Sequence, residues 1–147
     1  MQHFILPNAS AGPHIAGRPA CLLIVDDERD NRELLDVILT WEGFVIVTAA
    51  TGEEALAAVA LHLPHLVLLD LMMPGMDGYQ VTTRIRSDLA TTNTPIIIVS
   101  AMTDDTSRTA GRDCGAEGFV GKPVDREPLV TQVKELLRAS YPDYRDK

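Results

Sequence analysis

Cysteine is scarce in this sequence of 147 residues, which contains only Cys21 and Cys114. Two cysteines so far apart form neither a disulfide framework nor a Cys-x-x-Cys metal or redox pair. Long apolar runs are also missing. The apolar run 4–6 has no Lys or Arg before it and is too short for a signal peptide, and no segment approaches the roughly 20 residues of a membrane-spanning helix. These absences predict free thiols in a cytoplasmic protein without a membrane segment.

Basic residues are few, with 13 Lys and Arg against 21 Asp and Glu and a formal net charge of −8. The basic residues are scattered along the chain, whereas a surface that binds a phosphate backbone needs them clustered. The composition therefore excludes direct nucleic-acid binding. The hydrophobic content of 46% is that of a globular protein, which argues against disorder of the whole chain.

The chain divides into a domain with a short segment at each end. Residues 1–20 contain three prolines and two glycines without hydrophobic periodicity, which predicts a flexible N-terminal leader that the functional site does not need. Residues 140–147 are predicted to be a polar C-terminal tail. The domain then occupies residues 21–139, a usual size for one hydrophobic core.

Inside the domain, short apolar runs alternate with helical patterns. Runs of Val, Ile and Leu without polar interruption are typical of parallel strands buried on both faces, and a weaker fifth strand contains two glycines. The predicted strands cover 21–25, 44–47, 66–69, 96–99 and 118–121. The segment 103–113 must be the fourth helix, but its Thr, Ser, Asp and Gly predict a short or mobile one. Five such units with right-handed crossovers predict an α/β fold with a doubly wound sheet.

Polar residues follow four of the five predicted strands. Asp26 and Asp27 come directly after the first, Asp70 ends the third, Ser100 ends the fourth and Lys122 follows the fifth. Ligands of such sheets bind beyond the carboxyl ends of the strands, where these side chains converge. The sequence therefore predicts one pocket that contains three carboxylates, a hydroxyl and an amine.

This set of side chains indicates phosphoryl transfer to an aspartate. Three carboxylates in one pocket repel one another, and Mg²⁺ is the hard cation that such oxygen ligands hold beside a phosphate. Lys122 adds a second positive charge for an anionic ligand, and Ser100 adds a hydroxyl donor. Positioning and charge neutralisation are the main requirements of phosphoryl transfer.

Other readings of the same residues are weaker. Asp26-Asp27 alone would suit a helix N-cap. A flavodoxin-like cofactor domain needs Ser, Thr and Gly after its first strand, where Asp26, Asp27 and Glu28 would repel a phosphate. A hydrolase of the haloacid-dehalogenase type needs a second Asp two residues after the nucleophile, where this chain has Met72.

Four blocks of the sequence resemble the signatures of response-regulator receiver domains, the CheY-like family of two-component phosphorelay signalling. They are Leu-Ile-Val-Asp-Asp-Glu at 23–28, Asp-Leu-Met-Met-Pro-Gly-Met-Asp-Gly at 70–78, Ser-Ala at 100–101 and Gly-Lys-Pro at 121–123. The blocks stand in family order over roughly residues 21–139. The resemblance implies a five-stranded parallel sheet in the flavodoxin-like order 2-1-3-4-5 with helices on both faces.

The resemblance also implies a role for each residue of the pocket. Asp70 would be the phosphoacceptor, and Lys122 and Ser100 would stabilise the phosphoryl group. The implied Mg²⁺ ligands are Asp26, Asp27, Asp70 and the backbone carbonyl of Met72. Phe119 would be the aromatic switch that works with Ser100, although this chain has Ser and Phe where the family more often has Thr and Tyr. Pro123 would follow a cis peptide bond. Met72 and Met102 would flank the route of the water that removes the phosphoryl group.

By this resemblance, a histidine kinase or histidine phosphotransfer protein would be the donor. The phosphorylated chain would switch conformation to control a downstream effector, and it would dimerise, if at all, through the helix 103–113, the strand 118–121 and the last helix. Such a chain is a signalling domain rather than an enzyme, because it catalyses only its own phosphorylation and slow dephosphorylation. The alternative function is that of a degenerate receiver, a docking module that works without phosphorylation.

Overall fold

The main sheet of the molecule consists of five parallel strands. The computed structural model describes residues 12–146. The strands are β3 (Cys21–Val25), β4 (Val45–Ala49), β5 (Leu66–Asp70), β6 (Ile96–Ser100) and β7 (Gly118–Gly121). They lie in the order β4-β3-β5-β6-β7, which is 2-1-3-4-5 when the five are counted along the chain. The predicted α/β fold and its strand order are confirmed.

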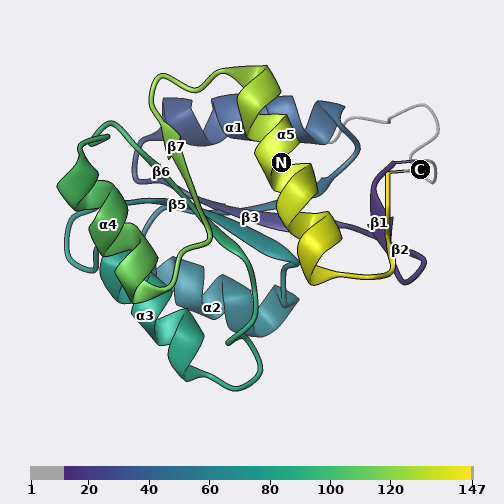
Figure 1. Cartoon of the computed structure of the whole chain (residues 1–147), viewed down its shortest axis with the longest axis horizontal. Coiled ribbons are helices and arrows are strands. Elements are labelled where there is room, and N and C mark those ends of the chain that lie inside the picture. The colour runs from purple at the N-terminus through teal and green to yellow at the C-terminus, as the bar shows by residue number, and fades with distance from the viewer. Residues whose placement is uncertain (1–11, 147) are drawn as a thin grey trace.

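Five helices cover both faces of this sheet. They are α1 (Arg29–Trp41), α2 (Gly52–His62), α3 (Gly78–Ser87), α4 (Asp105–Cys114) and α5 (Arg126–Ser140). In Figure 1, α1 and α5 lie on one side of the sheet, and α2 and α3 lie on the other. Between residues 12 and 146, no helix combines the length and apolar character needed to cross a membrane.

The continuous apolar runs are explained by the two cores. Because side chains alternate along a strand, Leu22 and Ile24 of β3 enter the core beneath α1 and α5. Leu23 and Val25 enter the core on the opposite face. All four side chains are almost completely buried. A strand covered on both faces therefore needs apolar residues at every position.

Helix α4 is the expected fourth helix, and together with α3 it is the shortest of the five described helices. It has ten residues and begins after Asp104, whose side chain accepts a hydrogen bond from the Ser107 N–H. It ends at Gly115, whose φ of 112° lies in the left-handed region that favours glycine. The two end signals offset the poor helix formers between them, because they satisfy backbone groups that the helix itself leaves without partners.

A second, antiparallel sheet joins the two ends of the described chain. The strands β1 (His14–Ile15), β2 (Arg18–Pro19) and β8 (Tyr144–Arg145) pair in the order β2-β1-β8. Ala16 and Gly17, both with positive φ, make the tight turn between β1 and β2. Figure 1 shows this sheet beyond the C-terminal end of α5. We call these three strands the terminal clasp.

The clasp differs from the expected leader and tail. Residues 12–20, expected to be a flexible leader, are ordered, and the tail contributes a strand; residues 1–11 lie outside the described part of the chain. Ile15 and Tyr144 are 6% and 5% exposed and belong to the core beneath α1 and α5. Burial of these two side chains stabilises the pairing of the end segments, although the proline, glycine and polar residues there predict a flexible leader and a polar tail.

Replacing Tyr144 with alanine should lower the free energy of unfolding by about 3 kcal/mol, because it removes a large buried side chain from the core. Chemical denaturation measures this change. Tyr144→Phe is the matched control, since it keeps the ring and loses only the hydrogen bond that the hydroxyl donates to Asp146. A loss below about 0.5 kcal/mol for Tyr144→Ala, the range of ordinary surface substitutions, would show that the clasp is not part of the core.

Candidate functional site

The carboxyl ends of the parallel strands bring the predicted site residues to one edge of the sheet. Asp26 follows β3, while Asp70 and Ser100 are the last residues of β5 and β6. Asp26, Asp27 and Asp70 each place a carboxylate oxygen within 4.8 Å of the other two. Asp26 and Asp70 are buried, and Asp27 is exposed. We call these three residues the acidic cluster.

Lys122, directly after β7, brings a cation to the acidic cluster. Its Nζ lies 2.8 Å from Asp26 Oδ2 and 3.5 Å from Asp70 Oδ1. Burial alone would lower the pKa of Lys122, but the hydrogen bond to Asp26 and the negative charges of Asp70 and Asp26 outweigh burial and raise the pKa above its usual value. Lys122 therefore stays charged and neutralises part of the cluster.

One ammonium group does not balance three carboxylates. Burial, and next to it the charge of Asp26, raises the pKa of Asp70 from 3.8 to about 6, although Lys122 and the N–H of Met72 act in the opposite direction. The carboxylate of Asp70 is thus held in an unfavourable charged form at neutral pH. A bound cation or an added group that reduces this negative charge would be stabilised here.

The main chain fixes the orientation of Asp70. The N–H of Met72 donates a hydrogen bond to Asp70 Oδ1 at 3.3 Å. Gly78, the first residue of α3, lies so close behind that a Cβ placed on it would be 2.5 Å from the carbonyl oxygen of Asp70. A glycine is therefore required where α3 begins, and Asp77 before it forms a capping box with Gln80.

Two hydrogen bonds fix Asp26 in the same way. The N–H of Glu28 donates to Asp26 Oδ1 at 2.9 Å, and Arg32 Nη1 donates to the carbonyl oxygen of Asp26 at 2.7 Å. Sequence analysis missed Arg32. No local pattern marks it, because a single arginine on a helix is more often solvated than bound to the backbone six residues before it.

Ser100 and Phe119 occupy the neighbouring strands β6 and β7. Ser100 is fully buried, and its Oγ accepts a hydrogen bond from the N–H of Met102 at 3.0 Å. Phe119 is half-buried, and the guanidinium carbon of Arg108 lies 4.7 Å from the centre of its ring. Sequence analysis did not single out Arg108. The peptide bond between Lys122 and Pro123 is cis, as the resemblance implies.

Met72 and Met102 are both exposed, with 59% and 44% of their surface accessible. The N–H of Met72 donates to Asp70 of the acidic cluster, and the N–H of Met102 donates to Ser100 at the end of the adjacent strand. Their thioether sulfurs are weak acceptors and cannot donate a hydrogen bond.

The donor set of the acidic cluster fits a divalent metal ion. Three carboxylates within 4.8 Å offer only oxygen atoms, which Mg²⁺ prefers over nitrogen and sulfur. Burial and the charge of Asp26 raise the pKa of Asp70, and a bound cation would favour its charged form. The chain can therefore hold such an ion through Asp26, Asp27 and Asp70.

Comparison with known proteins identifies the family of this domain. The family model of the response regulator receiver domain matches residues 22–134. The chain belongs to the response regulator receiver domain family. It is 40% identical over 119 residues to Response regulator PleD from Caulobacter vibrioides, and 41% identical over 117 residues to Probable transcriptional regulator ycf27 from Cyanophora paradoxa. These matches cover 81% and 80% of the chain but only 26% and 48% of the two relatives, so the receiver domain spans a quarter to a half of their length.

Solved structures show the same fold. A putative response regulator from Chloroflexus aurantiacus superposes with a TM-score of 0.80 at 36% identity, covering 82% of this chain and 99% of that one. CheY in the CheX-CheY-BeF₃-Mg²⁺ complex from Borrelia burgdorferi superposes with a TM-score of 0.76 at 35% identity, covering 82% and 90%. The receiver fold of this chain is thus shared by several bacterial regulators.

Replacing Asp70 with asparagine should stabilise the receiver domain in metal-free buffer at pH 8. The folded-state pKa of Asp70 is raised to about 6 from 3.8, so the free energy of unfolding falls as the pH rises from about 4 to about 6. A shift of two pKa units lowers the free energy of unfolding by at most about 3 kcal/mol when Asp70 ionises. The asparagine variant cannot ionise and avoids this loss.

Denaturation at pH 4 and pH 8 in EDTA measures the effect. The gain at pH 8 should be about 2 kcal/mol and should shrink at pH 4, where Asp70 is protonated. Asp143→Asn, which removes an exposed acid at the other end of the molecule, is the control. Equal gains at both pH values would show that ionisation of Asp70 does not lower the free energy of unfolding.

Proposed function

We propose that this receiver domain accepts a phosphoryl group from a phosphohistidine donor onto Asp70 and thereby controls a partner protein. The observation that carries the proposal is the position of Asp70, buried at the end of β5 between a carboxylate pair and the ammonium group of Lys122. A carboxylate in this position can act as a nucleophile. The phosphoryl group that it gains is negatively charged, and Lys122 and a bound cation would neutralise that charge from two sides.

In the proposed reaction, an Oδ atom of Asp70 attacks the phosphorus of the donor. A P–O bond forms as the P–N bond to the donor imidazole breaks, and the imidazole takes up a proton. Lys122 is placed to stabilise the transferred phosphoryl oxygens, since its Nζ already lies 3.5 Å from Asp70 Oδ1. Ser100, at the end of the adjacent strand, supplies a hydroxyl donor to the same group.

The ligands proposed for Mg²⁺ are Asp26, Asp27, Asp70 and the backbone carbonyl of Met72. The ion would neutralise negative charge on the phosphoryl oxygens. The Borrelia relative, whose complex contains BeF₃ and Mg²⁺, supports this choice of cation and of phosphoryl mimic. The chain would act as a phosphoacceptor and not as an enzyme with a separate substrate, because the group it transfers stays on its own side chain.

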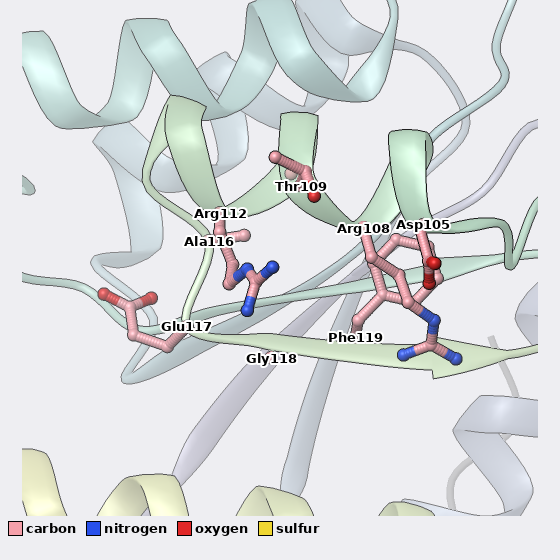
Figure 2. A pocket seen from close by; sticks show the side chains of 9 residues that line it. Asp105, Arg108, Thr109, Arg112, Ala116, Glu117, Gly118 and Phe119 are labelled. Carbon is pink, nitrogen blue, oxygen red and sulfur yellow. The ribbon is translucent and has the colours of Figure 1, made fainter.

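The proposed output surface is formed by α4, β7 and α5. A groove of about 520 Å³ lies between α4 and β7, and its lining includes Arg108, Arg112 and Phe119 (Figure 2). Phosphorylation would reach this surface through Ser100 and Phe119, which lie on the adjacent strands β6 and β7. A downstream effector or a second copy of the chain would bind there, and a histidine kinase or phosphotransfer protein would bind at the acidic cluster.

Mass spectrometry after incubation with acetyl phosphate and Mg²⁺ tests the proposal. The parent chain should gain one phosphoryl group, mapped to the peptide that contains Asp70, and the gain should disappear in excess EDTA and in the Asp70→Asn variant. A parent that is never modified would contradict the phosphoacceptor function and would favour the alternative of a phosphorylation-independent docking module.

A further inference from the structure

Arg108 joins α4 and β7 of the proposed output surface to the loop that follows Ser100. It lies on α4, its guanidinium carbon is 4.7 Å from the centre of the Phe119 ring on β7, and its Nε donates a hydrogen bond to the carbonyl oxygen of Thr103 at 3.1 Å. Thr103 belongs to the loop that leaves Ser100. Figure 2 shows the Arg108 side chain beside the Phe119 ring among the residues that line the groove.

The same three parts are closely packed against one another. A Cβ on Gly111 of α4 would lie 3.7 Å from the Phe119 ring and 3.1 Å from Ile98 of β6. A Cβ on Gly121, two residues after Phe119, would lie 2.8 Å from the side chain of Thr103. Helix α4 therefore packs directly against the Phe119 ring, and the loop packs directly against the end of β7.

Ser100 is connected to this unit through its loop. Its Oγ accepts a hydrogen bond from the N–H of Met102, the residue before Thr103. If the Ser100 side chain rotates to bring Oγ to a phosphoryl group on Asp70, the Met102 N–H must follow Oγ or lose this hydrogen bond, so the rotation would favour a shift of the loop. Arg108 opposes that shift, because it holds the loop at Thr103 and the ring at Phe119.

We propose that Arg108 is a latch that stabilises the described arrangement of the loop, α4 and Phe119 against the arrangement that phosphorylation favours. The proposal rests on the proposed function of Asp70 and adds a regulatory residue to it. Arg108 does not touch the reacting atoms, so it is a positioning residue. Its removal shifts a two-state equilibrium and leaves the acidic cluster unchanged.

The strength of the latch can be derived from its contacts. An exposed contact between a cation and an aromatic ring contributes a modest stabilisation. The hydrogen bond from Arg108 to a backbone carbonyl adds to it. A ligand that binds only the competent arrangement has an affinity proportional to the population of that arrangement, so loss of the latch should tighten its binding on the order of fivefold.

Arg112 offers a matched control on the same helix. It lies one turn further along α4, is exposed like Arg108 and lines the same groove. Within residues 12–146, the arginines stacked on aromatic rings are Arg108 and Arg138, so Arg112 shares the charge and the location without the ring contact. Arg108→Met and Arg112→Met remove the same charge and keep a similar length.

The test is the affinity of the full chain for beryllofluoride with Mg²⁺, measured for the parent, three single arginine variants, Phe119→Leu and the double variant Phe119→Leu, Arg108→Met. Arg108→Met should bind about fivefold more tightly, Arg108→Lys should lie between this variant and the parent, and Arg112→Met should match the parent. In the Phe119→Leu background, which removes the ring, Arg108→Met should change the affinity less than about twofold. Thermal unfolding of each variant checks that the fold is kept.

A second measurement reports on the latch without any phosphoryl mimic. Amide hydrogen exchange in the segment 101–104 should become faster in Arg108→Met and stay unchanged in Arg112→Met. Equal affinities for Arg108→Met and the parent, or an equal gain in the Phe119→Leu background, would overturn the latch while the phosphoacceptor function stands. A parent chain that is neither phosphorylated nor able to bind beryllofluoride would overturn both.

Discussion

Replacing Lys122 with methionine should slow the phosphorylation of Asp70 by acetyl phosphate at least about a hundredfold. Removal of one preorganised positive group from a site where negative charge develops has effects of this size. Lys122 is such a group, because its Nζ lies 2.8 Å from Asp26 and 3.5 Å from Asp70 and its side chain is only 16% exposed. Methionine fills a similar volume and carries no charge.

The same replacement should raise the pKa of Asp70 further above about 6, since Lys122 is one of the two groups that lower it, the other being the N–H of Met72. Part of the rate loss should therefore come from protonation of the nucleophile and should be smaller at high pH. Lys134→Met is the control: Lys134 is also half-buried and paired, but with Glu42 at 3.2 Å and away from the acidic cluster. A Lys122→Met chain phosphorylated at the parent rate would show that Asp70 reacts without this ammonium group.

The phosphorylated domain should lose its phosphoryl group slowly, and the double variant Met72→Asn, Met102→Glu should lose it at least about tenfold faster. Hydrolysis of an aspartyl phosphate needs a water held in line with the phosphorus, and groups that orient such a water speed the step strongly. Met72 contacts Asp70 through its N–H, Met102 contacts Ser100 in the same way, and both side chains are exposed to solvent. Neither thioether can orient a water well.

Decay of phosphoryl mass after removal of the donor measures the lifetime. The variant Met72→Asn, Met102→Gln is the control for charge, because Met102→Glu also adds a carboxylate near Asp70. If the two double variants decay at the same increased rate, hydrogen-bonding capacity rather than charge sets the effect. A double variant that decays no faster than the parent would show that these two positions do not control the lifetime.

The central sheet and the location of the pocket were predictable from the sequence. Apolar runs such as Leu22–Val25 are needed wherever a parallel strand is covered on both faces, and the structure places helices on both. Parallel strands end at one edge, so Asp26, Asp70 and Lys122 had to meet once the strands were identified. Local pattern and a topological rule were sufficient for this part.

The terminal clasp and the contacts of Arg108 were not predictable in this way. The strands β1 and β8 have two residues each and join His14 to Arg145 across nearly the whole chain, so no periodicity marks them. Arg108 reaches Phe119 only because α4 packs on β7, and its neighbours in the sequence resemble any exposed helix turn.

The family resemblance implied the order of the main strands, and the residues themselves predicted which segments are strands and which polar side chains meet beyond them. The strands and the meeting point follow from continuous apolar runs and from the shared direction of parallel strands, and both can be derived from short segments. The tertiary structure alone decided three other properties. These are how the described ends of the chain enter the core, how far burial and the charge of Asp26 raise the pKa of Asp70, and which arginine contacts Phe119. Burial, the electrostatic environment of a carboxylate and the stacking of an arginine on a ring all depend on distances between segments far apart in the chain. Those distances cannot be derived from a short segment of sequence.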